Sequence, residues 1–180
     1  MRSSIWLGTA ALLAVALSAA VACGQVTVTE VHEGFRHELA VNSGTFVMYE
    51  DVSIDYTVTN ESGEPVWMWF PCSGVSIRVV VRDMNDDLMW ISPDGCLDAF
   101  WDDTLDPGES YERGDTWDMF DYASWWPISE PGIYMVQGML TAYNDPHAHI
   151  VSLPITIVDA TTTVPDGDAT TWSLIKALYR

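Results

Sequence analysis

The sequence predicts an antiparallel β-sandwich of about eight strands with a short helical tail at its C-terminal end. Residues 52–60, V-S-I-D-Y-T-V-T-N, alternate apolar and polar side chains without a break, which is the pattern of a strand with one face on a core. Similar short apolar runs recur at near-regular spacing, separated by clusters of Gly, Pro, Asn and Asp. No strong helical pattern interrupts them. These observations favour an antiparallel sandwich.

The expected strands follow one another from residue 25 onward. The runs 52–60 and 66–70 flank the turn sequence E-S-G-E-P, so we predict that they form a hairpin. Trp67 and Trp69 point to one face of the second run and its other side chains to the opposite face, so one set can be exposed. Residues 33–44 are more polar and are expected to cross the surface as a loop. The other expected strands are 25–32, 45–49, 75–82, 88–91, 110–117, 133–141 and 151–157.

The chain divides into three parts, and its length of 180 residues suits one folded domain. The first part begins with Arg2, continues with an apolar stretch and ends in small residues, as secretory signals do. We therefore predict a signal peptide at residues 1–24, the sandwich domain at 25–158, and a linker with a short tail at 159–180. In the tail, residues 172–180 can form a helix with one apolar face.

The signal predicts an exported protein that is secreted, periplasmic or lipid-anchored in the cell envelope. The sequence A-V-A-C at residues 20–23 resembles a bacterial lipobox, in which Cys23 would carry the lipid. A cleavage after Gly24 would instead remove Cys23 with the signal. Both routes stay open from the sequence, and contact with a membrane is expected only through such an anchor.

The chain is strongly acidic. It has 26 Asp and Glu against seven Lys and Arg, a formal net charge of −19. Such a surface repels nucleic acid and anionic membranes, so neither is expected as a partner. It suits divalent cations or a basic partner, and it is also typical of a solvated surface without a specific partner.

Cys72 and Cys96 are the two cysteines that remain after either processing route. In an oxidising compartment such a pair predicts a disulfide, which would close a loop of roughly 25 residues and contribute about 3 kcal/mol. It would pin the segment 92–103 to the end of the strand 66–70. That segment is either stapled for stability alone or preorganised for binding.

Metal binding and catalysis find little support in the pattern of residues. Residues 83–87, D-M-N-D-D, follow the rhythm of a calcium loop, but Leu88 stands where that loop requires Gly, so a hairpin turn is expected. His147 and His149 would share a face on a strand but have no fixed third ligand. There is no G-x-S-x-G or H-E-x-x-H motif and no phosphate-binding glycine loop. We therefore predict no cofactor, no metal and no enzymatic activity.

A series of short motifs carries a resemblance to a known family over residues 52–157. The motifs are V-S-I-D-Y-T-V-T-N-E-S-G-E-P-V (52–66), I-R-V-V-V-R-D (77–83), Trp90, L-D-P-G-E-S-Y (105–111), T-W-D (116–118) and P-G-I-Y-M-V-Q-G (131–138). With these motifs in this order, the chain resembles the BsuPI-type intracellular proteinase inhibitor domain, which implies an immunoglobulin-like β-sandwich and a serine proteinase as partner.

The resemblance leads to a functional hypothesis and an alternative. The hypothesis is an exported, non-catalytic inhibitor of an extracytoplasmic serine proteinase, in which Leu97 or Phe100 offers an apolar side chain to a specificity pocket. The alternative is a structural or adhesion module of the envelope that binds carbohydrate, cations or another envelope protein. Exposed tryptophans such as Trp67 and Trp69 could serve either role, because indole rings stack on sugars and anchor protein interfaces.

Overall fold

The computed structural model describes residues 24–71, 76–93, 100–121, 128, 130–142 and 149–159. Within these residues the chain forms eleven strands and no helix. Nine match the expected strands, while β2 and β8 were not predicted. The strands are β1 (Val26–His32), β2 (Phe35–Val41), β3 (Thr45–Val47), β4 (Val52–Asn60), β5 (Val66–Phe70), β6 (Ile77–Arg82), β7 (Leu88–Ile91), β8 (Trp101–Leu105), β9 (Ser110–Trp117), β10 (Gly132–Leu140) and β11 (Ile150–Val158).

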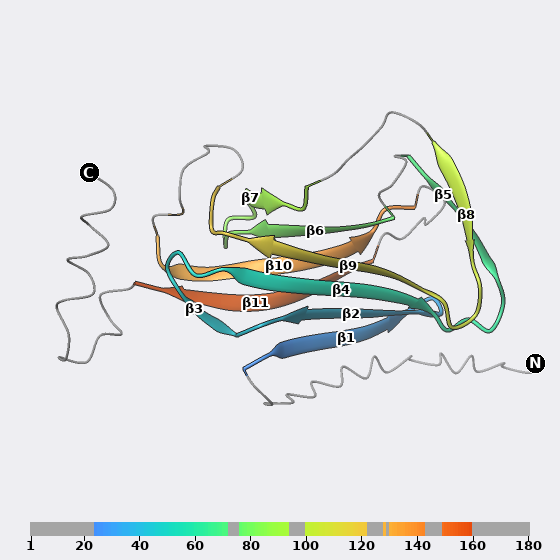
Figure 1. The fold of residues 1–180 in the computed structure, drawn as a ribbon, viewed down its shortest axis with the longest axis horizontal. Helices are drawn as coiled ribbons and strands as arrows, with labels where there is room; N and C mark the ends of the chain where they lie inside the picture. The colour runs from blue at the N-terminus through green and yellow to red at the C-terminus, as the bar shows by residue number, and fades with distance from the viewer. Residues whose placement is uncertain are drawn as a thin grey trace, which may run out of the picture.

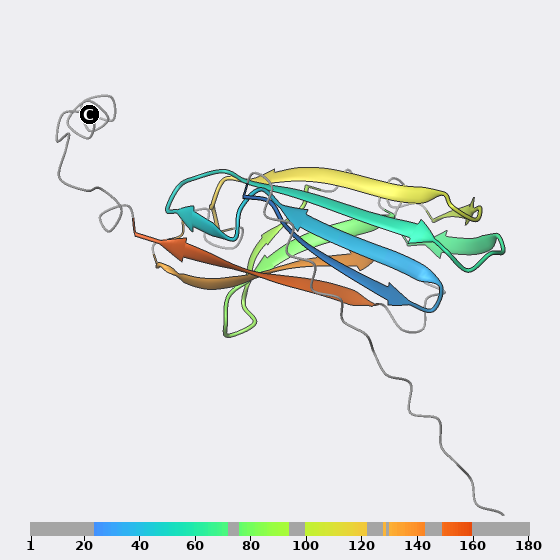
Figure 2. The same cartoon turned by 90° about the horizontal axis from the view of Figure 1, so that it is seen from below.

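Two sheets form the layers of the sandwich (Figures 1 and 2). One sheet has the strand order β1-β2-β4-β9 and the other β3-β11-β10-β6-β7. Neighbouring strands are antiparallel except β3 and β11, which are parallel. The protein is thus an all-β, immunoglobulin-like antiparallel sandwich, as the sequence predicts.

The core lies between the two layers and is organised around β4. Its alternating side chains Val52, Ile54, Tyr56 and Val58 are fully buried, while Ser53 and Asp55 are exposed, so the period-two pattern is confirmed. They pack into one hydrophobic cluster with side chains of the facing sheet, among them Val79, Val81, Val136 and Val151.

The close packing between the layers depends on a glycine of β10. A Cβ atom at Gly138 would lie 2.6 Å from Cδ2 of the buried Tyr56 ring. Glycine therefore leaves the space in which the Tyr56 ring lies directly against the backbone of the opposite sheet. The hydroxyl of Tyr56 lies 2.8 Å from Nδ1 of the buried His37, so the polar end of this ring is also satisfied.

The predicted hairpin between β4 and β5 is wrong. Both edges of β4 are occupied, by β2 on one side and β9 on the other. Strand β5 pairs instead with β8, in a separate two-stranded sheet with Trp69 opposite Asp102. We call this pair the β5–β8 ribbon; it lies at the right-hand end of the molecule in Figure 1. The predicted loop 92–103 therefore includes the beginning of a strand, and the predicted surface loop 33–44 contains β2.

Asn60 attaches the base of the ribbon to the sandwich. This residue is fully buried at the end of β4, and its side-chain amide donates hydrogen bonds to the carbonyl groups of Glu64 and Leu105, both at 2.8 Å. The side-chain oxygen Oδ1 of Asn60 accepts hydrogen bonds from the backbone N–H and the hydroxyl of Ser62. One side chain thus fixes the turn before β5 and the end of β8 together.

Several predictions fall on residues outside the described ranges. They include residues 1–23 of the predicted signal peptide 1–24, with Cys23, the cysteines Cys72 and Cys96, and the helical tail 172–180. The disulfide and the tail helix therefore stay predictions. In the part of the chain that is described, no helix is long and apolar enough to cross a membrane.

Candidate interaction surface on the β5–β8 ribbon

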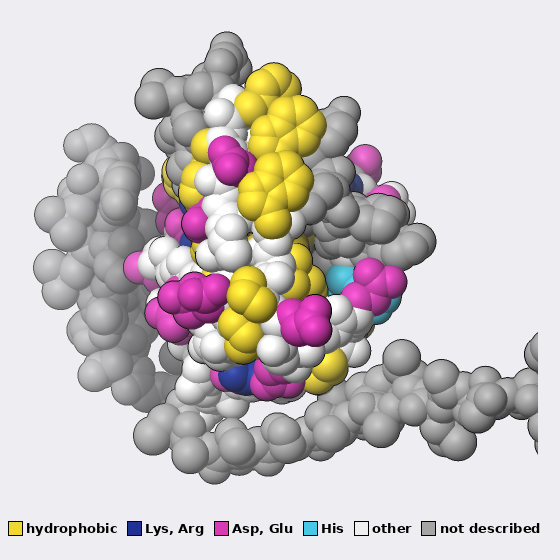
Figure 3. Space-filling view, turned by 90° about the vertical axis from the view of Figure 1, so that its right-hand side faces the viewer, with side chains coloured by type: hydrophobic (Ala, Val, Ile, Leu, Met, Phe, Trp, Pro, Cys, Tyr) yellow, Lys and Arg dark blue, Asp and Glu magenta, His cyan; other side chains and the backbone are white. Residues whose placement is uncertain are grey.

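Three aromatic side chains lie on the outer side of the ribbon. In β5, Met68 and Phe70 are buried, so Trp67 and Trp69 point to the opposite side. Trp67 is 54% exposed, and Phe100, which immediately precedes β8, is 63% exposed. We call Trp67, Trp69 and Phe100 the aromatic face. Figure 3 shows hydrophobic side chains gathered on this end of the molecule, with acidic side chains beside them.

Contacts between neighbours hold the aromatic face in place. The rings of Trp69 and Phe100 are stacked, with centroids 4.9 Å apart and an interplanar angle of 28°. The indole Nε1–H of Trp67 donates a hydrogen bond of 3.2 Å to Oδ2 of Asp102. The exposed rings are thus partly ordered before any partner arrives, which lowers the entropic cost of binding.

The inner side of the ribbon is packed against the sandwich. The Phe70 ring stacks on Trp101 at 4.9 Å and meets the ring of Tyr111 in β9 edge-on at 5.6 Å. Leu105 at the end of β8 is buried in the main core. These aromatic contacts attach the inner side of the ribbon to the sandwich. They therefore hold the strands that carry the aromatic face in a fixed position.

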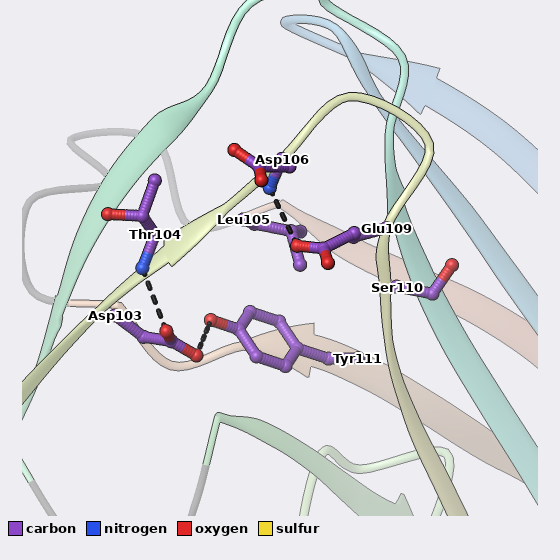
Figure 4. Close-up of a pocket in the computed structure, with 7 residues that line it drawn as sticks. All are labelled: Asp103, Thr104, Leu105, Asp106, Glu109, Ser110 and Tyr111. Carbon is purple, nitrogen blue, oxygen red and sulfur yellow. Dashed lines mark hydrogen bonds between the residues drawn. The ribbon is translucent and has the colours of Figure 1, made fainter.

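An acidic hollow of about 500 Å³ lies beside the ribbon at the turn between β8 and β9 (Figure 4). The phenol of Tyr111 donates a hydrogen bond of 2.9 Å to Oδ2 of Asp103, and Oδ1 of Asp103 accepts one from the backbone N–H of Thr104. Across the turn, a Glu109 carboxylate oxygen accepts a hydrogen bond from the N–H of Asp106. The hollow is lined by Asp103, Thr104, Leu105, Asp106, Glu109, Ser110 and Tyr111.

The charges around the hollow act on Tyr111. Burial raises the pKa of its phenol well above the ordinary value, and the hydrogen bond to Asp103 and the negative charges of Asp103 and Glu109 raise it further. Tyr111 therefore remains a protonated donor over the physiological range. The hollow presents carboxylate oxygens and no positive charge from its own lining.

The predicted site residues have different outcomes. Phe100 is exposed on the aromatic face, whereas Leu97 lies outside the described residues. The segment 83–87 is the turn between β6 and β7, in which Oδ1 of Asp83 accepts hydrogen bonds from the N–H groups of Asn85 and Asp87. The backbone hydrogen bond from Asp87 is the main cause that lowers the pKa of Asp83.

His149 has partners that the sequence did not reveal. Its ring stacks on His32 of β1 with centroids 4.6 Å apart, and it lies 4.9 Å from the ring of His37. Its Nε2 is 2.8 Å from Oε2 of Glu30. His147 lies outside the described residues. Among the residues described, no group of three or more His, Cys, Asp or Glu side chains is arranged to hold a metal ion.

Sequence reasoning did not find the acidic hollow or the approach of Phe100 to Trp69. The signal that could have located the hollow is the run L-D-P-G-E-S-Y at 105–111, which places a tight turn between carboxylates. The contact between Phe100 and Trp69 depends on the pairing of β5 with β8, two strands that are separated in the sequence by the β6–β7 hairpin.

Comparison with known proteins identifies the family. A family model described as "BsuPI: Intracellular proteinase inhibitor" matches residues 39–145, which is more than half of the chain. The chain therefore belongs to the BsuPI family. No curated protein matches the chain.

The family description corrects one prediction. The N-terminal segment led us to predict an exported protein that is secreted, periplasmic or lipid-anchored. The matching family is described as intracellular. This description contradicts the predicted export, so the prediction is wrong.

Several solved structures match this chain at low similarity. A β-glucosidase from Erythrobacter marinus is 16% identical, with a TM-score of 0.41 over 69% of this chain and 15% of that chain. A β-glucosidase from Listeria innocua is 16% identical, with a TM-score of 0.40 over 72% and 16%. The CARDB domain of the PF1109 protein from Pyrococcus furiosus is 15% identical, with a TM-score of 0.39 over 69% and 94%. This chain thus spans about a sixth of the β-glucosidase chains, and these matches carry no functional argument.

Proposed function

We propose that this protein is a non-catalytic inhibitor that binds a serine proteinase through the aromatic face of the β5–β8 ribbon. The observation that carries the proposal is the family match over residues 39–145, because that range includes both strands of the ribbon and Phe100. A proteinase inhibitor acts by protein–protein contact, so the site to look for is an exposed and supported surface rather than a catalytic cleft.

The aromatic face has the properties of a binding centre. Tryptophan is enriched among the residues that dominate the energy of protein interfaces, and such residues lie centrally with polar groups around them. Here Trp67 and Phe100 are exposed, while Asp102 and Thr104 of β8 lie exposed beside them. The stacking and hydrogen bonding within the face support binding without a large loss of side-chain entropy.

The side chain of Phe100 indicates which class of proteinase to test. It is an exposed apolar residue immediately before β8, and its ring stacks on that of Trp69. A proteinase with an apolar specificity pocket could accept this side chain, while the indole of Trp67 covers the rim. Chymotrypsin-like and subtilisin-like enzymes are therefore the first class to test.

The test is a titration of the full chain against a panel of these proteinases, with the products separated on a gel. The proposal predicts a stoichiometric end point for at least one enzyme, with the chain intact or cut slowly at a single position. Full activity of every proteinase at a large molar excess of the chain would contradict it.

A further inference from the structure

The β5–β8 ribbon combines exposed aromatic rings with carboxylates. Asp102 lies on the same side as the aromatic face, directly opposite Trp69 in the strand pairing. The hollow at the turn between β8 and β9 adds three more carboxylates, those of Asp103, Asp106 and Glu109. This end of the molecule is therefore both apolar and negatively charged, a combination that a neutral hydrophobic partner would not match.

The arginines of the described residues do not neutralise this region. These residues contain four arginines and no lysine, and none of the four belongs to the aromatic face or lines the hollow. Ion pairs within the sandwich sheets and their turns join Arg36 with Glu38 and Glu61, Arg82 with Asp86, and Arg113 with Asp115, and Arg78 is also engaged in an interaction within the chain. Because no arginine of the described residues belongs to the aromatic face or lines the hollow, we look to a partner for the complementary positive charge.

We infer that the aromatic face and Asp102 form a docking site for an arginine side chain on a basic patch of the partner. This inference rests on the proposed function, since it names the chemistry of the proteinase surface that the ribbon contacts. A guanidinium group can stack on an indole ring and at the same time donate hydrogen bonds to a neighbouring carboxylate. The Trp67 to Asp102 hydrogen bond places a ring and a carboxylate side by side for this purpose.

Arginine fits this arrangement better than lysine. Its guanidinium is planar and presents several N–H donors in one plane, so it can contact a ring face and an acid together, whereas an ammonium is a point charge with stronger hydration. The acidic hollow next to the ribbon adds attraction for further basic residues of the same patch and speeds their approach at low salt.

The test uses a hexa-arginine peptide and its neutral isostere hexa-citrulline, titrated into the ¹⁵N-labelled full chain. The indole N–H signal of Trp67 is assigned by its absence in Trp67→Phe. We expect this signal to shift with hexa-arginine and not with hexa-citrulline. Asp102→Asn should weaken hexa-arginine binding about three- to tenfold.

Asp51→Asn is the matched control, because it removes one exposed carboxylate from the segment between β3 and β4, at the opposite end of the molecule (Figure 1). Equal weakening by both substitutions would overturn the inference, since it would show only a general attraction to an acidic chain. Circular dichroism of both variants checks that the fold is kept.

The proteinase titration separates this inference from the proposed function. If a proteinase is inhibited but hexa-arginine leaves Trp67 unchanged and Asp102→Asn inhibits fully, the arginine site is wrong and the inhibitor function stands. If no proteinase is inhibited, but hexa-arginine binds at Trp67 and this binding depends on Asp102, the arginine site is supported and the inhibitor function is contradicted.

Discussion

The indole Nε1 of Trp67 lies 3.2 Å from Oδ2 of Asp102, so an exposed aromatic ring of β5 is tied to an exposed carboxylate of β8. The bond runs across the ribbon and not within one strand. It fixes the orientation of the ring and of the acid at the same time, and it ties the aromatic face to the acidic surroundings of the ribbon.

Trp67→Phe removes this hydrogen bond while it keeps an aromatic side chain. We expect inhibition of the target proteinase to weaken by about fivefold, or about 1 kcal/mol, because the ring at position 67 loses the contact that orients it for binding. The midpoint of thermal unfolding should hardly change, since Trp67 is largely exposed. Inhibition constants and melting curves of both proteins check this. A large drop in the melting midpoint would show that the bond is structural.

Asn60→Asp should loosen the base of the ribbon. The substitution leaves the carbonyl groups of Glu64 and Leu105 facing a buried carboxylate instead of an amide donor. We expect a loss of at least about 3 kcal/mol in the free energy of unfolding. Urea unfolding measures it.

Asn85→Asp is the control for this substitution, because it makes the same chemical change in the exposed β6–β7 turn. It should cost less than about 1 kcal/mol. Similar losses for the two variants would contradict the role given to Asn60.

Gly138→Ala should destabilise the sandwich because the new methyl group collides with the buried Tyr56 ring, whose nearest atom would be 2.6 Å away. We expect a loss of about 1–3 kcal/mol in the free energy of unfolding. Gly132→Ala in the same strand is the control, since its nearest neighbour is at 3.9 Å. Equal tolerance of both substitutions would contradict the close packing of Gly138 against Tyr56.

Tyr111 should make the protein sensitive to alkali. Its pKa is raised in the folded state, mainly by burial and then by Asp103, above the 10.0 of an unperturbed phenol. The folded chain therefore holds a proton that the unfolded chain releases, so the contribution to stability is complete below pH 10 and is lost as the pH rises further. Tyr134 adds to this trend, because burial raises its pKa as well.

Tyr111→Phe provides the measurement for this prediction. This substitution should lower the stability near pH 8, because the variant lacks the hydrogen bond to Asp103. The stability difference from wild type should then stay constant below pH 10 and shrink as the pH rises above 10, since phenylalanine does not ionise. Parallel stability curves over this range would contradict the assignment.

The strands with regular alternation could be predicted from the sequence, and the pairing of strands could not. Strand β2 was missed because His37, which is buried and bonded to Tyr56, counts as polar in a pattern of side chains. In β8, Asp103 breaks the inward apolar pattern because it faces Tyr111 and accepts its hydrogen bond. The local pattern of side chains reveals neither case, because the residue that forms a hydrogen bond with the polar side chain lies on another strand.

The candidate site was predicted in its parts but not as a whole. The spacing of Trp67 and Trp69 placed them on one side of a strand, and Phe100 was singled out as a contact residue. Their association depends on the pairing of β5 with β8, whereas the turn sequence between β4 and β5 favours a local hairpin. Nothing in the sequence shows that both edges of β4 are already occupied by β2 and β9.

The most direct test of the account compares three proteins against one proteinase that the wild-type chain inhibits. They are wild type, the double variant Trp67→Ala/Phe100→Ala, and Tyr49→Ala, which removes a 59% exposed aromatic residue between β3 and β4. The account predicts that the double variant loses about 100-fold or more in inhibition, as expected for two central interface residues, while Tyr49→Ala stays within about twofold of wild type. Equal inhibition constants for all three proteins would contradict the assignment of the aromatic face as the binding site.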